Sequence, residues 1–363
     1  MNPHGLRRWA PALTASVVLG AVGIAGAYGG GDDAVSTVDT EVLDSVLDED
    51  SLPGAGSASG PSESAPEVTE APPSTAAKTT LKRVLAKGSR GKDVRRVQQR
   101  LVDLGYDPGM VDGVFGEKTR SAVWAFEKLV MGVPARKVTG KVNDKMWQRM
   151  QDRLVVRPKR KKTTKVHLEV YLPEQVAVLF EGGKVRLITH ISSGTGKFWE
   201  ELVTIDPGED GNVNGKAPIQ AIVRGFSVTP GGTYKFNRRY VDPATGGWRE
   251  GRLGRMYKPV YFNKGIAVHG SGNVPSYPAS HGCIRIPMHI AEYFPELVKN
   301  GDQVFVFDGK KSPEYYGAQP PRADSITRVT TTTTTTTTTV KKTTTTVKKT
   351  TTTTTSSSSI PPE

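Results

Sequence analysis

The sequence predicts two folded domains in one chain: a small all-α domain of three helices, followed by a larger, mostly β domain. Two observations favour this multidomain fold class. Apolar residues recur at helical spacing between residues 85 and 152, whereas from residue 166 they alternate in short β-rich runs punctuated by glycine and proline. Both ends of the chain are too poor in large apolar residues to build a core. We expect these N- and C-terminal segments to be disordered, so the 363 residues overstate the folded part.

The chain begins with an uncharged run that follows two arginines. Arg7 and Arg8 precede residues 9–31, which are rich in alanine, valine and glycine, and the stretch "AGA" at 25–27 fits a cleavage site. The run is also long enough to span a bilayer, which takes about 20 residues. Residues 1–31 are therefore a signal peptide or a signal anchor, and membrane anchoring through them stays open. We expect an exported protein at the cell wall or on the extracytoplasmic face of the membrane.

Residues 32–80 read as an acidic, disordered linker rich in serine, proline and alanine. Residues 29–80 contain eleven acids and one lysine, whereas the whole chain carries +13, so the remaining residues carry about +23. A basic exported body suits an anionic envelope polymer or a membrane surface. Nucleic acid, the other usual partner of such charge, is not expected, because the chain is exported and lacks a clustered recognition motif.

Residues 85–152 carry the helical pattern. The stretch "GKDVRRVQQRLVDLG" places Val94, Val97, Leu101 and Leu104 on one face and stops at Gly105. A second helix follows "DGVFGEKT" and a third contains "KMWQRM". The order of these stretches resembles the peptidoglycan-binding domain of the three-helix type. The resemblance implies attachment to the glycan or the stem peptides of peptidoglycan.

The remaining segments follow from composition and period. Residues 153–165 form a basic connector, and residues 166–308 are predicted to fold as the mostly β domain, with Gly182 and Gly183 at a hairpin turn. Within that domain, residues 197–227 lie between the stretches "ISSGTG" and "TPGGTYKF". They are predicted to form either a lid or extra strands. Residues 309–363 are a Thr-rich, low-complexity tail.

The single cysteine, Cys283, lies in "PASHGCIRIP". An exported chain normally pairs its cysteines, so one leftover thiol is either a small buried hydrophobe or a reagent. A thiol becomes a strong nucleophile only when a base removes its proton. His281 lies two residues before Cys283, and His269 lies 14 residues upstream at the end of a β-rich run. Both histidines are candidates for that base.

The stretch "HGSGNVPSYPASHGCIRIP" resembles the signature of the L,D-transpeptidase catalytic domain, and "ISSGTG" and "TPGGTYKF" match two upstream elements of that family in the right order. The resemblance covers residues 166–308 and implies a β-sandwich-like domain without a cofactor. It also implies that Cys283 is the nucleophile, that His269 is the base, and that the Gly270 carbonyl orients the imidazole. The thiolate would attack a tetrapeptide stem between its third and fourth residues and expel D-Ala. A second stem's amine would then take the acyl group, giving a 3→3 cross-link.

Other motif residues receive expected roles. Backbone N–H groups at Gly282 and Cys283 would hold the oxyanion. Ser280 and His281 would line the site, Ser280 as a substrate-binding residue, or would orient the loop by hydrogen bonds. Arg285 would pair with a substrate carboxylate or with a structural partner. His190 and His289 are expected to be structural. Since no cysteine or histidine cluster has zinc spacing, no metal is implied.

Three alternatives stay open. An L,D-carboxypeptidase would use the same residues and let water take the acyl group. A non-catalytic wall-binding or structural protein would keep Cys283 inert. A papain-like peptidase would carry its histidine far downstream of the cysteine, whereas His269 precedes Cys283. The transpeptidase interpretation implies a role in peptidoglycan biosynthesis, wall organisation and cell shape, with stem peptides and glycan as partners.

Overall fold

A computed structural model describes residues 65–70, 77–332 apart from 210, 241, 252, 322 and 323, and 352–355. The predicted signal segment, most of the linker and most of the Thr-rich tail lie outside the described residues. No helix in the described ranges combines the length and apolar character needed to cross a bilayer.

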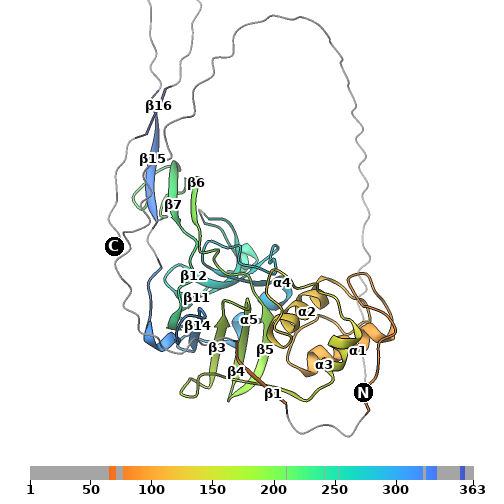
Figure 1. Ribbon diagram of the computed structural model, residues 1–363. Coiled ribbons are helices and arrows are strands. Elements are labelled where there is room, and N and C mark those ends of the chain that lie inside the picture. The colour runs from red at the N-terminus through yellow and green to blue at the C-terminus, as the bar shows by residue number, and fades with distance from the viewer. Residues whose placement is uncertain are drawn as a thin grey trace, which may run out of the picture. The chain divides into compact units, whose positions relative to one another are not determined.

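Three helices form the N-terminal part of the described fold (Figure 1): α1 (Lys92–Asp103), α2 (Glu117–Leu129) and α3 (Asp144–Met150). On α1 the predicted face is buried at Val94, Val97 and Leu101. This helix ends just before Gly105, whose φ of 89° suits glycine. The side chain of Asn143 accepts a hydrogen bond from the Met146 N–H at 2.9 Å and so caps α3.

A five-stranded sheet follows the helices, with strand order β5-β4-β3-β14-β8. The neighbours β3 and β14 are parallel and the other pairs antiparallel. Gly182 and Gly183 both have positive φ and form the tight turn between β4 and β5, as predicted. The strands are β3 (Val166–Tyr171), β4 (Val176–Glu181), β5 (Lys184–His190), β8 (Gly232–Lys235) and β14 (Gln303–Phe307).

A second sheet carries the predicted site. Its order is β10-β11-β12-β13, with β9 also pairing β11, and β12 runs parallel to β13. Two short helices, α4 and α5, follow β13. The elements are β9 (Arg238–Arg239), β10 (Trp248–Arg249), β11 (Met256–Asn263), β12 (Ile266–Ser271), β13 (Ile284–Pro287), α4 (Met288–Ala291) and α5 (Phe294–Leu297).

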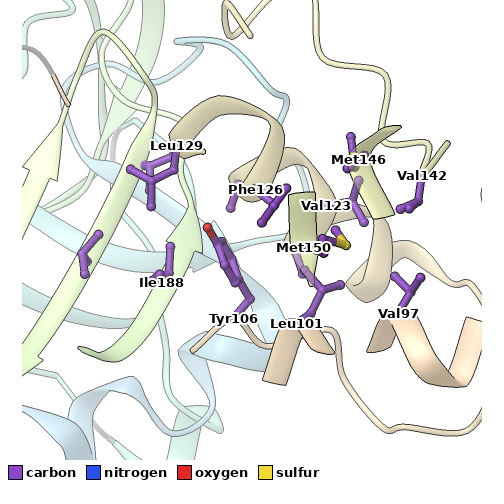
Figure 2. Close-up of a cluster of buried hydrophobic side chains, with 14 of the residues drawn as sticks. Val97, Leu101, Tyr106, Val123, Phe126, Leu129, Val142, Met146, Met150 and Ile188 are labelled. Carbon is purple, nitrogen blue, oxygen red and sulfur yellow. The ribbon is translucent and has the colours of Figure 1, made fainter. Parts of the chain in front are cut away.

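The first sheet is covered on both faces. Val178 and Phe180 of β4 and Ile188 of β5 join the core of the helices, and Figure 2 shows Tyr106 and Leu129 beside Ile188. The alternate residues, Ala177 and Leu179 among them, pack toward the second sheet. The prediction of a small helical domain followed by a mostly β, sandwich-like domain is therefore confirmed. The helical core is continuous with the sheet rather than separate from it.

Residues 197–227 were predicted to form either a lid or extra strands. They contain an antiparallel pair of strands, β6 and β7, which belongs to a third sheet. The strand β15 adds to the outer edge of β7 and places Ile326 on a small core with Val203 and Val223. The first part of the predicted Thr-rich tail therefore contains a strand that pairs with the catalytic domain. The β-branched run "SITRVTTT" suits an edge strand. The elements are β6 (Phe198–Ile205), β7 (Ile219–Phe226), β15 (Ser325–Thr332) and β16 (Thr352–Thr355).

The predicted linker and connector also contain structure. The strand β1 (Glu67–Glu70), in the linker, pairs antiparallel with β2 (Leu154–Arg157), in the connector. The connector continues onto the first sheet, where the buried carboxylate of Glu169 accepts hydrogen bonds from the backbone N–H groups of Lys159 and Arg160. The buried carboxylate of Glu169 thus obtains partners that composition alone did not reveal. Single 3-10 turns occur at Pro243–Thr245 and Pro313–Tyr315.

Candidate active site

The register of β12 and β13 gathers the predicted residues on one face. Val268 pairs with Ile284 and both side chains are buried between the sheets. Successive side chains on a strand alternate between faces, so His269 and Arg285, the next pair, point to the opposite side. Cys283 immediately precedes β13 and shares that face with them. Residues 14 positions apart in sequence are therefore diagonal neighbours on adjacent strands.

His269 is held as a neutral base. It is 5% exposed, and its Nδ1 lies 3.0 Å from the carbonyl oxygen of Gly270. Because a carbonyl only accepts, Nδ1 carries the proton and Nε2 is left with a free lone pair. Burial, aided by the positive charge of Arg285, lowers the pKa of His269 to about 4. The Gly270 carbonyl thus contacts the ring as the family resemblance implies, and the ring can accept a proton at neutral pH.

The thiol of Cys283 is partly exposed and protonated at rest. Burial raises its pKa, although the Ala267 N–H and the charge of Arg285 act in the opposite direction. Its Sγ lies 3.7 Å from the carbonyl oxygen of Gly265. Within the described residues, Sγ makes no hydrogen bond to His269, but catalytic hydrogen bonds often tighten only when substrate binds.

Ser280 and Gly282 shape the turn that presents the thiol. The buried Ser280 Oγ donates to the Cys283 carbonyl at 2.5 Å and accepts from the Gly282 N–H at 3.1 Å. Ser280 therefore orients the turn by hydrogen bonds, which is one of its two expected roles. The Gly282 N–H, expected as an oxyanion donor, is engaged by Ser280. We find no acceptor for the Cys283 N–H within the described part of the chain, which leaves it as the candidate donor.

Gly282 itself cannot carry a side chain without strain. Its φ is +143°, and a Cβ would lie 2.9 Å from the carbonyl oxygen of Val228. The Thr229 hydroxyl donates to the Gly282 carbonyl at 2.6 Å and accepts from the Gly194 N–H at 2.9 Å. The Ser193 carbonyl accepts from the N–H of Ser280 at 3.0 Å. The two upstream motifs thus hold residues 280–283, which we call the cysteine turn, through hydrogen bonds. The order of these motifs in the sequence was the only signal for the contacts.

His281 faces the β6–β7 hairpin. Its Nε2 lies 3.2 Å from a carboxylate oxygen of Glu201, and its ring packs edge-on against Trp199 at 4.7 Å. Sequence reasoning missed both partners, because they come from the segment 197–227 that it left unassigned.

Arg285 has no carboxylate within ion-pair distance among the described residues. Of its two expected roles, pairing with a substrate carboxylate is therefore the one that the described contacts leave open.

Tyr261 lies close enough to Cys283 for their charges to interact, and a cation lies over its ring. Tyr261 of β11 pairs with Ala267 on one side and with Arg238 of β9 on the other. The Arg238 guanidinium lies 4.2 Å from the centre of the Tyr261 ring, and a charge on Cys283 raises the pKa of Tyr261, although burial is the main cause. No sequence motif pointed to this pair, since the β9 strand is only two residues long.

A cavity of about 550 Å³ lies elsewhere, between the ends of α1, α2, β2 and the β4–β5 turn. None of its lining residues belongs to the predicted site. The described residues contain no group of three or more histidine, cysteine or acidic side chains that could hold a metal ion.

In comparison with known proteins, the chain matches the models of two families. Residues 165–306 match the family model of the L,D-transpeptidase catalytic domain, and residues 90–150 match that of a peptidoglycan binding domain. Among curated proteins, no significant match was found.

Similar solved structures include an L,D-transpeptidase from Xylanimonas cellulosilytica, 28% identical, covering 63% of this chain and 100% of that one with a TM-score of 0.49. Another is an L,D-transpeptidase from Stackebrandtia nassauensis, 20% identical, covering 66% and 99% with a TM-score of 0.32. Both scores are below 0.5, so the assignment rests on the family models. Residues 165–306 therefore belong to the L,D-transpeptidase family of catalytic domains, joined in this chain to a peptidoglycan-binding domain.

Proposed function

We propose that the protein is an exported wall enzyme that forms 3→3 peptidoglycan cross-links through a thioester on Cys283, with release of D-Ala. The observation that carries this proposal is the placement of Cys283 and a neutral His269 on one face of the β12–β13 pair. A protonated thiol beside a neutral imidazole is the resting state that a thiol nucleophile with a general base requires.

Acylation comes first. The Nε2 of His269 takes the thiol proton, and Sγ attacks the carbonyl carbon between the third and fourth residues of the donor stem. The Cys283 N–H donates to the oxyanion, an interaction worth roughly 3 kcal/mol in acyl transfer. The bond to the D-Ala nitrogen then breaks, and that nitrogen takes the proton from His269. The acyl group is left on Sγ as a thioester.

Transfer follows by the reverse use of the same groups. The amine of a second stem attacks the thioester carbon and gives its proton to His269. The carbon–sulfur bond breaks, and the thiolate recovers the proton. Arg285, which has no acidic partner among the described residues, supplies a positive charge for a carboxylate of the substrate. The helical domain keeps the enzyme beside its polymer, which raises the local substrate concentration.

The product profile on defined muropeptides tests the proposal. The purified protein is incubated with tetrapeptide-bearing stems, and products are separated and weighed. We expect D-Ala and 3→3 dimers, both absent with Cys283→Ala. Trimmed stems without dimers would support the L,D-carboxypeptidase alternative, and no product from the wild type would support the non-catalytic alternative.

A further inference from the structure

The loop that joins the two halves of the site is held by the helical domain. Residues 272–279, which we call the active-site loop, connect the strand of His269 to the turn of Cys283. Two side chains of the helical domain, Lys128 and Arg136, reach this loop or its support. The proposed chemistry assigns no role to either of them.

Lys128, near the end of α2, extends into the catalytic domain and is 2% exposed. Its Nζ donates to the Gln175 carbonyl at 2.6 Å and lies 2.9 Å from Nδ1 of His190. Nε2 of His190 in turn lies 2.8 Å from the carbonyl oxygen of Val274 in the active-site loop. Since that carbonyl accepts, Nε2 carries the ring proton, and Nδ1 accepts from Lys128. The three groups form a continuous buried chain from α2 to the loop.

Burying the polar groups of Lys128 and His190 costs free energy of desolvation. We therefore expect this hydrogen-bonded chain to have a positioning role. Burial lowers the pKa of Lys128 and of His190, and the charge of Lys128 lowers that of His190 further. No acidic side chain lies within ion-pair distance of Lys128 among the described residues, so its desolvation is offset by its two hydrogen bonds and by the more distant charges of Glu127 and Glu174. An apolar residue would fill the same slot more simply.

Gln175 extends the same support toward the thiol. Its side chain donates to the Ser193 hydroxyl and accepts from the Ser193 N–H, at 2.8 and 2.9 Å. The Ser193 carbonyl holds the Ser280 N–H, as described above. Lys128 is therefore linked to the active-site loop through His190 and to the cysteine turn through Gln175.

A second contact is independent of the first. The guanidinium of Arg136, in the turn after α2, lies 4.5 Å from the ring centre of Tyr277 in the active-site loop. The Tyr277 carbonyl accepts from the Ser192 hydroxyl at 2.7 Å, so the residue is fixed at both its ring and its backbone. The helical domain thus reaches the loop directly at Tyr277 and, through His190, at Val274.

We propose that the peptidoglycan-binding domain is a structural part of the active site, in which Lys128 and Arg136 are positioning residues for residues 272–279. The proposal rests on the proposed function of Cys283. It implies that the loop reaches its reactive shape only when the helical domain is docked, because small displacements of catalytic groups cost large factors in rate.

The test uses the full chain with Lys128→Met, Arg136→Gln and, as a matched control on an exposed helical lysine, Lys145→Met. The first readout is the rate at which a carbapenem acylates Cys283, followed by intact mass below the unfolding temperature of each variant. We expect an approximately tenfold or greater loss for Lys128→Met. For Arg136→Gln we expect about two- to fivefold, and no change for Lys145→Met.

The second readout is hydrogen exchange of the amides of residues 272–279, which does not depend on a reaction at Cys283. We expect faster exchange in this loop for Lys128→Met and Arg136→Gln while the β12 amides stay protected. Unchanged loop exchange in both variants would overturn the proposal. Failure of the wild type to react with the carbapenem, with faster loop exchange in the variants, would overturn the proposed function and leave the positioning role standing.

Discussion

The two sides of the cysteine turn are held in different ways. On the side of the helical domain, the partners are buried: Lys128, His190 and Ser193 are at most 2% exposed. On the side of the β6–β7 hairpin, the contact of His281 with Glu201 joins side chains that are 27% and 47% exposed. Buried hydrogen bonds are costly to break, whereas exposed ion pairs contribute little. The helical side should therefore set the geometry of the turn, and the hairpin side should tolerate change.

The largest effect on the acylation rate should come from His269, which lies between the two sides as the proposed base. His269→Gln removes the proposed base, and we expect acylation by a carbapenem or a tetrapeptide donor to slow by about 10²- to 10⁴-fold. Intact-mass kinetics measures this. An acylation rate within threefold of the wild type would assign the base to another residue, with His281 as the other histidine that the sequence suggests.

The pH dependence sharpens the same point. Burial holds the folded pKa of His269 at about 4, below its ordinary value of 6.5, so the neutral base persists to low pH. We expect acylation to decline only as the pH approaches 4. As the pH falls from 6.5 to 4, His269 takes up a proton in the unfolded chain but stays neutral in the folded protein. The contribution of His269 to the free energy of unfolding is therefore fully present above pH 6.5 and is lost as the pH falls toward 4. Chemical denaturation of wild type and His269→Gln across this range measures the difference between their slopes.

Gly282→Ala should have the next largest effect. The added Cβ meets the Val228 carbonyl at 2.9 Å in a backbone conformation with φ of +143°. We expect a loss of about 1–3 kcal/mol in stability and slower acylation. Gly272→Ala is the matched control, because a Cβ there meets nothing within 4 Å. Equal stability of the two variants would contradict the tight turn.

Ser280→Ala should cost less than Gly282→Ala and more than any change on the hairpin. The variant leaves the Gly282 N–H without its partner, and we expect a loss of about 1–2 kcal/mol. Thermal unfolding and the acylation rate together measure it. Normal stability with weakened donor binding would instead indicate the substrate contact that the family resemblance implied for Ser280.

Glu201→Gln should change acylation least, by less than about threefold, because Glu201 is exposed and its partner His281 is only partly buried. Glu200→Gln is the control, since Glu200 lies on the opposite face of β6 and pairs with Arg224. A loss as large as that of Lys128→Met would break the comparison between the two sides.

The sequence made the local features predictable. The face of α1, the turn at Gly182 and Gly183, and the motif around Cys283 depend on residues close together in the chain. The expected partner of His269, the Gly270 carbonyl, is its direct neighbour. These features follow from spacing and from backbone preferences that act over a few residues.

The remaining features depend on pairings between distant segments. His190 was interpreted as structural because its partners Lys128 and Val274 lie 62 and 84 residues away. Thr229 holds the Gly282 carbonyl from 53 residues upstream. The pairing of β15 with β7 was missed because its threonines resemble the rest of the tail. Periodicity reports which face of an element is buried, but it does not identify what covers that face.

The most direct test of the central claim is the mass of the protein after brief exposure to a tetrapeptide donor without an acceptor. We predict a mass gain equal to the donor less D-Ala, located on the peptide that contains Cys283 and absent from Cys283→Ala. An unmodified wild type that still releases D-Ala, or the same adduct on Cys283→Ala, would contradict a thioester on this residue.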